Sequence, residues 1–337
     1  MKKQRRVITS LWGGNGVAER CEVRAENGER TACVAKRIQF PKDSSVDARR
    51  KRKSYRNELA FYRTVAPDLL GDDVCAVPRP VELLAEKDAI TLVLVDVSAE
   101  YPVALEELSA TQLRTALQWL ARFHARYWER PDLHRGLAKR GSYWFLETRP
   151  DELKRIDTRR YKRLLRCAPA LDARLNGVVH ERGQRRYSPS FLTLVHGDYK
   201  PANLQFTRDG SRCVAYDFQY TGRGYGALDL CYLLYPDTVN QDGMLRHYHR
   251  ALCAALEPAQ SAPSFQQLTE LVELSFLDFF RFLLGWYYDR RRPPAALEQA
   301  ATRILSRIDG GELLSVKGYQ EAVARAYPLH GLEPRVT

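Results

Sequence analysis

The stretch that most constrains the fold is LVHGDYKPANLQF, residues 194–206, where polar side chains interrupt an apolar, strand-like run. Asp198 lies five residues before Asn203, and Asn203 lies 14 residues before Asp217, which follows a second apolar run. The residues between them, LQFTRDGSRCVAYDF, have the pattern of a hairpin. Because a hairpin brings its two ends together, we expect Asp217 to fold back beside Asn203. The three polar side chains should then form one compact site.

The residue types at these positions suit phosphoryl transfer from a nucleotide, a reaction in which the protein mainly positions groups and offsets charge. We expect Asp198 to accept the proton of a substrate hydroxyl. Asn203 and Asp217 offer the hard oxygen ligands that Mg²⁺ prefers. His196 is expected to bond the loop backbone, because Asp198 already fills the role of the base.

A kinase site also needs a lysine on an early strand and a glutamate on a helix that holds it. The segment CVAKRI provides Lys36, and YRNELAFY provides Glu58. Taken singly, Lys36 could be a surface lysine at a strand end and Glu58 one of many exposed helix carboxylates. Their order along the chain, together with the loop and hinge described next, argues against coincidence.

Two further segments occur where a kinase needs a phosphate-covering loop and an adenine-binding hinge. The segment WGGNG, residues 12–16, separates the first two strand-like segments, although alone it could be a hairpin turn. The strand TLVLVDV leads into a hinge whose backbone could bond adenine. The residues expected to bind the nucleotide in these two segments are Gly13, Gly14, Gly16, Val95 and Val97.

The hydrophobic pattern predicts an α+β fold with a small β-rich N-terminal lobe and a larger, mainly helical C-terminal lobe. We expect residues 1–98 to form the nucleotide-binding lobe and residues 99–337 the catalytic and substrate-binding lobe. Ser109 is a candidate N-cap for the first helix of the larger lobe. The expected strands lie within 7–40 and 76–99, and the expected helices are 55–66, 110–128, 227–235, 244–256, 265–288, 295–308 and 317–326.

The formal net charge of +12 is concentrated in MKKQRR at the start and in RRKRKSYR, residues 49–56, where six of eight residues are basic. Such runs can contact nucleic acid or acidic lipids. No nucleic-acid-binding motif accompanies them. We therefore expect a solvated helix face beside a site that handles phosphates, and no nucleic-acid partner.

The apolar runs and the cysteines indicate the cellular compartment in which we expect the protein. The N-terminal residues lack a signal-peptide pattern, and the longest apolar segment, residues 271–288, contains Glu273, Asp278 and Arg281, which indicates a buried helix and no membrane span. The seven cysteines are scattered and never spaced as Cys-x-x-Cys, so neither a disulfide framework nor a zinc site is indicated. We expect reduced thiols and a cytoplasmic location.

The sequence resembles a known protein family. LVHGDYKPANLQF with VAYDFQYTGRGYGALDLCYLL is similar to the aminoglycoside phosphotransferase and choline kinase superfamily, specifically its ecdysteroid kinase-like branch, which includes bacterial phosphotransferases of undefined substrate. LWGGNG, VLVDVSAEYP, WLARFHARYW and GSYWFLETRPDEL are similar to the same bacterial group. The resemblance spans roughly residues 10–255. It implies a protein-kinase-like bilobal fold, ATP with Mg²⁺, and a small-molecule hydroxyl as acceptor.

The resemblance also implies individual roles. Asp229, in GALDLCY, would anchor the catalytic loop from the following helix. HGDYKPAN resembles the catalytic loop of protein kinases as well, and by that likeness Lys200 would neutralise the transferring γ-phosphate.

Three departures argue against a protein substrate. Gly197 stands where protein kinases usually have an arginine that reads a phosphorylated activation loop, and Asp217 is followed by Phe-Gln where they have Phe-Gly. Asp229 follows Asp217 by only 12 residues, which is too few for a long activation segment.

The acceptor is constrained only by charge. Cationic acceptors such as aminoglycosides or choline favour acidic pockets, whereas this chain is strongly basic, so we expect a neutral or anionic alcohol. Residues 141–153, GSYWFLETRPDEL, could line the acceptor pocket with Tyr143 and Trp144, or could be a packed connector between helices. The alternatives to a small-molecule kinase are a protein Ser/Thr kinase and an inactive pseudokinase or basic scaffold that binds nucleotide or RNA.

Overall fold

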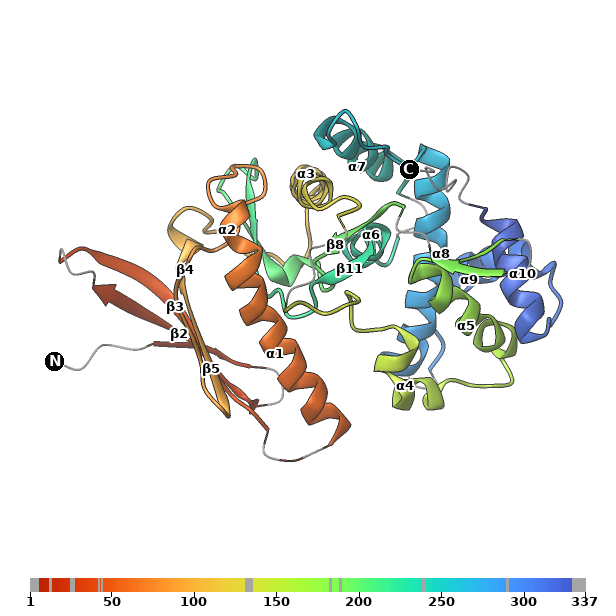
Figure 1. The fold of residues 1–337 in the computed structure, drawn as a ribbon, viewed down its shortest axis with the longest axis horizontal. Helices are drawn as coiled ribbons and strands as arrows, with labels where there is room; N and C mark the ends of the chain where they lie inside the picture. The colour runs from red at the N-terminus through yellow and green to blue at the C-terminus, as the bar shows by residue number, and fades with distance from the viewer. Residues whose placement is uncertain are drawn as a thin grey trace. The chain divides into compact units, whose positions relative to one another are not determined.

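The structure, a computed structural model, forms two compact units that no single cut in the sequence separates (Figure 1). The first unit comprises residues 1–119, 134–138 and 200–221, and the second comprises residues 120–133, 139–199 and 222–337. The predicted lobe boundary near residue 98 therefore stays a prediction. The residues that the structure describes are 6–11, 14–24, 28–41, 43, 45–130, 136–181, 184–187, 190–237, 241–288 and 291–328.

An antiparallel five-stranded sheet in the order β1-β2-β3-β5-β4 forms the base of the first unit. Alternation along β3 buries Cys33 and Ala35 on one face, where they cluster with Val93. Lys36 therefore points to the other face, which α1 covers (Figure 1). The strands are β1 (Arg6–Ser10), β2 (Gly16–Arg24), β3 (Arg30–Gln39), β4 (Pro80–Ala85) and β5 (Ala89–Val95), as the sequence predicted.

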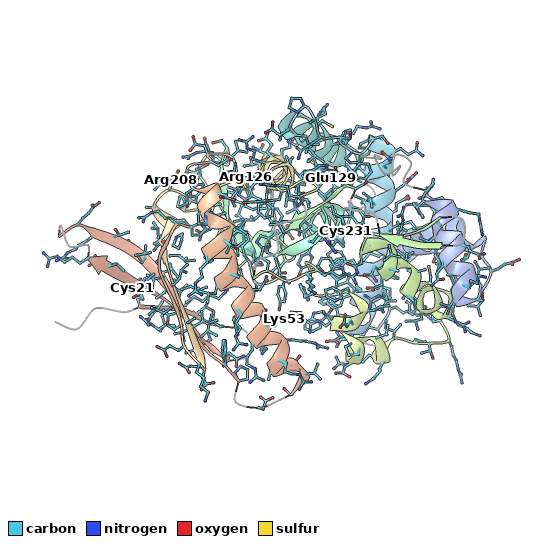
Figure 2. The ribbon with its side chains drawn as sticks, in the orientation of Figure 1. Cys21, Lys53, Arg126, Glu129, Arg208 and Cys231 are labelled. Atoms are coloured by element: carbon cyan, nitrogen blue, oxygen red, sulfur yellow. The ribbon has the colours of Figure 1, made fainter. Side chains whose placement is uncertain are left out.

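Helix α1 (Val46–Thr64) begins earlier than the predicted start at residue 55. Ser45 caps it by accepting a hydrogen bond from the amide of Ala48 at 3.1 Å, and Asp47 lies in its first turn. The basic run is therefore helical, because Arg and Lys are good helix formers and the cap satisfies an otherwise unpaired amide. Figure 2 labels Lys53 on this helix.

The hairpin of β9 (Leu204–Phe206) and β10 (Cys213–Ala215) belongs to the first unit although it lies late in the sequence. Single β-bridges join Ala76 to Val214 and Val103 to Phe206. The first unit also contains the short helix α2 (Ala66–Leu69), the 3₁₀ helices Val97–Ala99 and Pro201–Asn203, and the start of α3 (Ala110–Arg126). Ser109 forms the predicted cap of α3, donating to and accepting from Gln112.

The second unit is mainly helical around α8 (Phe265–Trp286), which packs against five other helices of that unit. None of the described helices is long and apolar enough to cross a membrane. Helices α6 to α10 confirm the predicted helices to within a few residues, whereas the elements between 150 and 187 were not predicted. The elements of this unit besides α8 are α4 (Pro150–Arg155), α5 (Lys162–Leu175), α6 (Ala227–Leu234), α7 (Asp242–Ala255), α9 (Ala295–Asp309), α10 (Val316–Ala326), the 3₁₀ helix Leu146–Thr148, β6 (Val178–Glu181), β7 (Gln184–Tyr187), β8 (Leu192–Val195) and β11 (Gly222–Tyr225).

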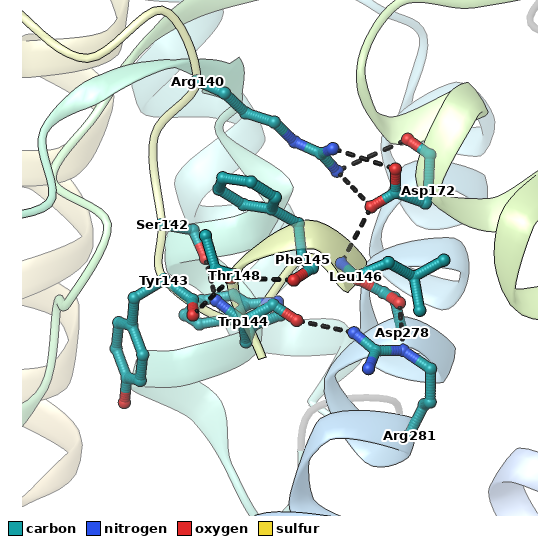
Figure 3. A network of polar contacts seen from close by, with 10 residues as sticks. All are labelled: Arg140, Ser142, Tyr143, Trp144, Phe145, Leu146, Thr148, Asp172, Asp278 and Arg281. Carbon is teal, nitrogen blue, oxygen red and sulfur yellow. Dashed lines mark hydrogen bonds and ion pairs between the residues drawn. The ribbon is translucent and has the colours of Figure 1, made fainter. Parts of the chain in front are cut away.

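A buried polar network attaches the distinctive GSYWF segment to α8 (Figure 3). Arg281, 1% exposed, bonds Asp278 through Nε at 2.7 Å and donates from Nη2 to the carbonyl of Trp144 at 2.5 Å. The Trp144 ring is 1% exposed and packs against Phe279. For Trp144 the structure therefore supports a packed connector rather than a pocket wall.

Replacing Arg281 by methionine should lower the free energy of unfolding by about 3–5 kcal/mol, because Asp278 would stay buried without its cation. The double variant Arg281→Met/Asp278→Leu should regain much of that loss. The exposed pair Arg246–Asp242 on α7 is the matched control, and Arg246→Met should cost less than about 1 kcal/mol. Urea unfolding measures all three, and a double variant less stable than Arg281→Met would contradict the assignment.

Candidate functional site

Lys36, Glu58 and Asp217 form an ion-pair cluster within the first unit, although Asp217 is 181 residues away from Lys36 in the sequence. Lys36 Nζ lies 2.7 Å from Glu58 Oε2 and 2.8 Å from Asp217 Oδ1. The side chains are 14% exposed for Lys36, 2% for Glu58 and 31% for Asp217, so the cluster opens to solvent mainly at Asp217. Lys36 and Glu58 pair with each other as expected, and their role in binding a nucleotide stays a prediction.

Local structure positions Asp217 tightly. Its backbone φ is +68°, a left-handed conformation that Asp and Asn tolerate better than most residues. The next residue, Phe218, stacks on Phe61 of α1 with ring centroids 3.6 Å apart. Gln219 Nε2 donates to Asp217 Oδ1 at 2.7 Å.

Asn57 of α1 fixes the segment after Asp217. Its side-chain amide, 4% exposed, donates to the carbonyls of Phe218, Gln219 and Thr221 at 3.4, 3.1 and 2.8 Å. Asn57 was not among the site residues expected from the sequence. The only sequence signal for it is its position next to Glu58.

The charges of the cluster are compatible with a bound cation. Burial opposes the charge on Lys36, but the carboxylates of Asp217 and Glu58 outweigh burial and raise the pKa of Lys36. Burial raises the pKa of Glu58 to about 7, with Asp217 adding to the increase and Lys36 opposing it. One ammonium thus serves two carboxylates, and the surplus negative charge fits a divalent cation at the more exposed Asp217.

The β9–β10 hairpin brings the second expected ligand next to Asp217 along the backbone. Leu204 pairs with Ala215, and the amide of Tyr216 donates to the carbonyl of Asn203 at 3.1 Å. Asn203, 6% exposed, therefore lies across from the residue that precedes Asp217. In the described part of the chain, no three His, Cys, Asp or Glu side chains form a group that could hold a metal ion.

The glycine-rich turn between β1 and β2 has two glycines in the described residues. Gly14 has φ +72° and Gly16 φ +149°. A Cβ atom at Gly16 would lie 1.9 Å from the carbonyl oxygen of Arg37 on β3, so this position requires glycine. The amide of Leu11 closes the turn by donating to the Gly16 carbonyl at 2.8 Å. Gly13, also expected in the loop, lies outside the described residues.

The expected hinge follows β5, and hydrogen bonds and an ion pair hold its backbone and Asp96. The amides of Val95 and Asp96 donate to the carbonyls of Arg79 and Ala32, both at 2.9 Å. The Asp96 carboxylate accepts from Ser98 and pairs with Arg20 Nε at 3.0 Å. Partial burial raises the pKa of Asp96, but these bonds outweigh it and lower the pKa below its ordinary value.

Asp229 holds the expected catalytic loop within the second unit. Its Oδ2 accepts from the amide of His196 at 2.7 Å, and its Oδ1 accepts from the amide of Gly197 at 2.8 Å. Gly197 has φ +82°, and the amide of Asp198 donates to Nδ1 of His196 at 3.3 Å. This is the anchoring geometry expected for Asp229, and His196 bonds the loop backbone as expected.

His124 and Tyr248 extend this buried network. Nε2 of His124 lies 3.1 Å from Asp229 Oδ2, and Nδ1 lies 2.8 Å from the hydroxyl of Tyr248. All three side chains are at most 1% exposed. His124 is thus a satisfied core histidine, as expected. Tyr248 was not identified from the sequence because no spacing signal links α7 to the loop.

The expected site residues fall in both units. Lys36, Glu58 and Asp217 are in contact within the first unit, which also contains Asn203 and the half-buried Lys200. Asp198, 5% exposed, belongs to the second unit. Convergence of Asp198 with Asn203 and Asp217 therefore remains a prediction.

Comparison with known proteins gives one family and several structures. Residues 23–263 match APH, described as the phosphotransferase enzyme family. No match was found among curated protein sequences. The structure of a microcompartment-associated aminopropanol kinase superposes with a TM-score of 0.57 at 16% identity, covering 98% of this chain and 94% of the other.

Two choline kinase-related structures are less similar. Choline kinase LicA from Streptococcus pneumoniae gives a TM-score of 0.48 at 14% identity, covering 94% of each chain. A choline/ethanolamine kinase family protein from Mesorhizobium loti gives 0.48 at 13% identity, covering 96% of this chain and 93% of the other. The likeness to the aminopropanol kinase structure confirms the predicted α+β, protein-kinase-like fold class.

Proposed function

Because the chain belongs to the APH phosphotransferase enzyme family, we propose that it is an ATP- and Mg²⁺-dependent O-phosphotransferase acting on a hydroxyl group of a small molecule. The observation that carries this proposal is the cluster of Lys36, Glu58 and Asp217, in which two carboxylates share one ammonium. A lysine held by a helix glutamate can bind phosphate oxygens, and the remaining carboxylate can bind a cation.

The residues of the first unit would bind the nucleotide. Lys36, held by Glu58, binds the α- and β-phosphates, and the turn with Gly14 and Gly16 covers them. At the hinge, the carbonyl of Val95 and the amide of Val97 bond adenine, since the Val95 amide is already used. Asn203 and Asp217 would hold Mg²⁺, which would supply positive charge to offset the negative charge of the phosphates during transfer.

Asp198 would act on the acceptor. Its carboxylate takes the proton of the acceptor hydroxyl as that oxygen bonds to the γ-phosphorus and the bond to the bridging oxygen of ADP breaks. Lys200 offsets the negative charge on the transferring group. Asp229 keeps the loop in place by accepting the amides of His196 and Gly197.

We further propose a neutral or anionic alcohol as acceptor, and membership of the ecdysteroid kinase-like branch. The net charge of +12 favours such acceptors over cations, because like charges repel. The aminopropanol and choline kinases that resemble this chain in structure act, by their names, on amino alcohols. A cationic acceptor is therefore the alternative that the acceptor test must include.

A screen with γ-labelled ATP, Mg²⁺ and panels of neutral, anionic and cationic hydroxyl compounds tests this function. We expect label to enter a neutral or anionic compound, and EDTA to abolish the transfer. Label in added peptides instead would favour a protein kinase. Absence of any transfer, with no thermal-shift response to ATP and Mg²⁺, would favour a scaffold, because a ligand of the folded state must raise its stability.

A further inference from the structure

A hollow of about 280 Å³ lies on the basic side of α1, and none of the residues assigned to the nucleotide is among those that line it. It belongs wholly to the first unit. Four cationic side chains of α1 line it, and none of the described residues that line it is acidic. These cationic residues are Arg49, Arg52, Lys53 and Arg56.

The spacing of the four cations gathers them on one face of the helix. Their positions follow the pattern i, i+3, i+4 and i+7, which places side chains on one side of an α-helix. Like charges at these spacings repel and destabilise a helix. A bound anion would relieve this repulsion.

The hollow has a second wall, which distinguishes it from a solvated charged face. Residues 136–138 form that wall, and Leu137 is 8% exposed. The amide of Ala138 donates to Oδ1 of Asn57 at 2.6 Å, so a buried side chain of α1 fixes the wall. Of the other basic residues in the run, Arg50 pairs with Asp47, and neither Arg50 nor Lys51 lines the hollow.

Two of the lining arginines are held in place by uncharged groups, so their positive charge is not neutralised. Arg52 donates from Nη1 to the carbonyl of Pro41 at 2.8 Å, and the guanidinium of Arg56 lies 5.0 Å from the ring centroid of Phe40. Lys53 is exposed and has no hydrogen-bond or ion-pair partner among the residues that the structure describes (Figure 2). The hollow therefore presents positioned guanidinium groups beside an available ammonium.

We propose that this hollow binds a phosphate group carried by a small molecule, at a site separate from the nucleotide site. Planar guanidinium groups match phosphate oxygens in geometry, and an added ammonium favours a doubly charged anion. The volume suits one phosphate group with a small organic part. A concave site with two walls favours such a ligand over RNA, which contacts extended basic surfaces.

The same helix links the hollow to the nucleotide-binding residues. Asn57, which lines the hollow, bonds the backbone that follows Asp217, and the next residue, Glu58, holds Lys36. An anion in the hollow would thus stabilise the helix that positions Lys36. The binding test below uses no nucleotide or turnover, so its failure and the failure of the kinase assignment are distinguishable.

Isothermal titration of the full-length protein with inorganic phosphate tests the site, and Lys53 and Lys51 form a matched pair on one helix. We expect saturable binding that Lys53→Gln weakens about tenfold and Lys53→Glu weakens further, whereas Lys51→Gln leaves it unchanged. Phosphate should raise the melting temperature of wild type and Lys51→Gln more than that of Lys53→Gln. Circular dichroism checks that each variant is folded.

Further binding experiments identify which kind of molecule carries the phosphate group. Glycerol 3-phosphate binding with the same dependence on Lys53, and no binding to phosphatidic acid vesicles, would support a soluble phosphate ester. Lys53-dependent binding to the vesicles alone would overturn the small-molecule ligand. Absence of saturable phosphate binding would overturn the site, as would equal weakening by Lys51→Gln and Lys53→Gln. Binding of a short RNA duplex that both lysines support equally, without saturable phosphate binding, would assign the helix to a nucleic-acid surface instead.

Discussion

Replacing Asp198 by asparagine should lower kcat by about 100- to 10,000-fold, which is the contribution of a positioned general base, while ATP affinity stays close to wild type. Asparagine keeps the shape of the side chain but cannot take the acceptor proton. The loop should keep its conformation, because backbone amides hold it in place. The amides of His196 and Gly197 donate to Asp229, and the amide of Asp198 donates to His196.

Steady-state kinetics with the acceptor from the screen measure this effect, and nucleotide titration measures ATP binding. Asp242→Asn, which removes an exposed carboxylate on α7 that pairs with Arg246, is the matched control and should keep wild-type kcat. Turnover at the wild-type rate in Asp198→Asn would exclude Asp198 as the base. A parallel loss of ATP binding would instead indicate that the substitution disturbs the loop.

Replacing Asp217 by asparagine should abolish the Mg²⁺-dependent part of nucleotide binding and weaken ATP affinity in Mg²⁺ by about 100-fold or more. The expected effect is this large because even residues that only hydrogen-bond to a metal ligand contribute about 10- to 100-fold to metal affinity. Asparagine is the sharper substitution here because it tolerates the φ of +68°, whereas alanine would add backbone strain. Lys36 keeps its bond to Glu58 in the variant, so the apo protein should retain its melting temperature.

Titration of the protein with ATP, once in Mg²⁺ and once in EDTA, separates the Mg²⁺-dependent part of the ATP affinity from the Mg²⁺-independent part. In wild type the two affinities should differ strongly, and in Asp217→Asn they should nearly coincide. Asp209→Asn, in the turn of the same hairpin, is the matched control, because its carboxylate bonds Thr207 and Ser211 on that turn. An unchanged Mg²⁺ effect in Asp217→Asn would remove this residue from the metal site.

Much of the local structure follows from short-range patterns. The hydrophobic pattern predicted the strands that carry Lys36 and Val95, and helical periodicity predicted α6 to α10. The Asn203 to Asp217 spacing predicted the hairpin that the structure contains. These features depend on neighbours within a few residues, so a single sequence carries their signal.

The start of α1 shows where local interpretation failed. The basic run of residues 49–56 was interpreted as a solvated helix face, but the apolar pattern of the helix was recognised only from residue 55. Ser45 and Asp47 stabilise an earlier start, and the later turns are held by burial of Tyr55, Leu59 and Tyr62. The elements between 150 and 187 were missed for a related reason, since α5 contains Pro169, which breaks the usual helical pattern.

The sequence by itself determined the α+β class and which side chains are candidates for phosphoryl transfer, because residue type, spacing and periodicity are properties of short segments. Its resemblance to a known family implied the protein-kinase-like fold. Tertiary structure alone decided that Lys36 faces two carboxylates, that His124 and Tyr248 support Asp229, and that one face of α1 lines a basic hollow. These pairings join residues far apart in the chain. Their energies depend on burial and distance, which exist only once the core has packed.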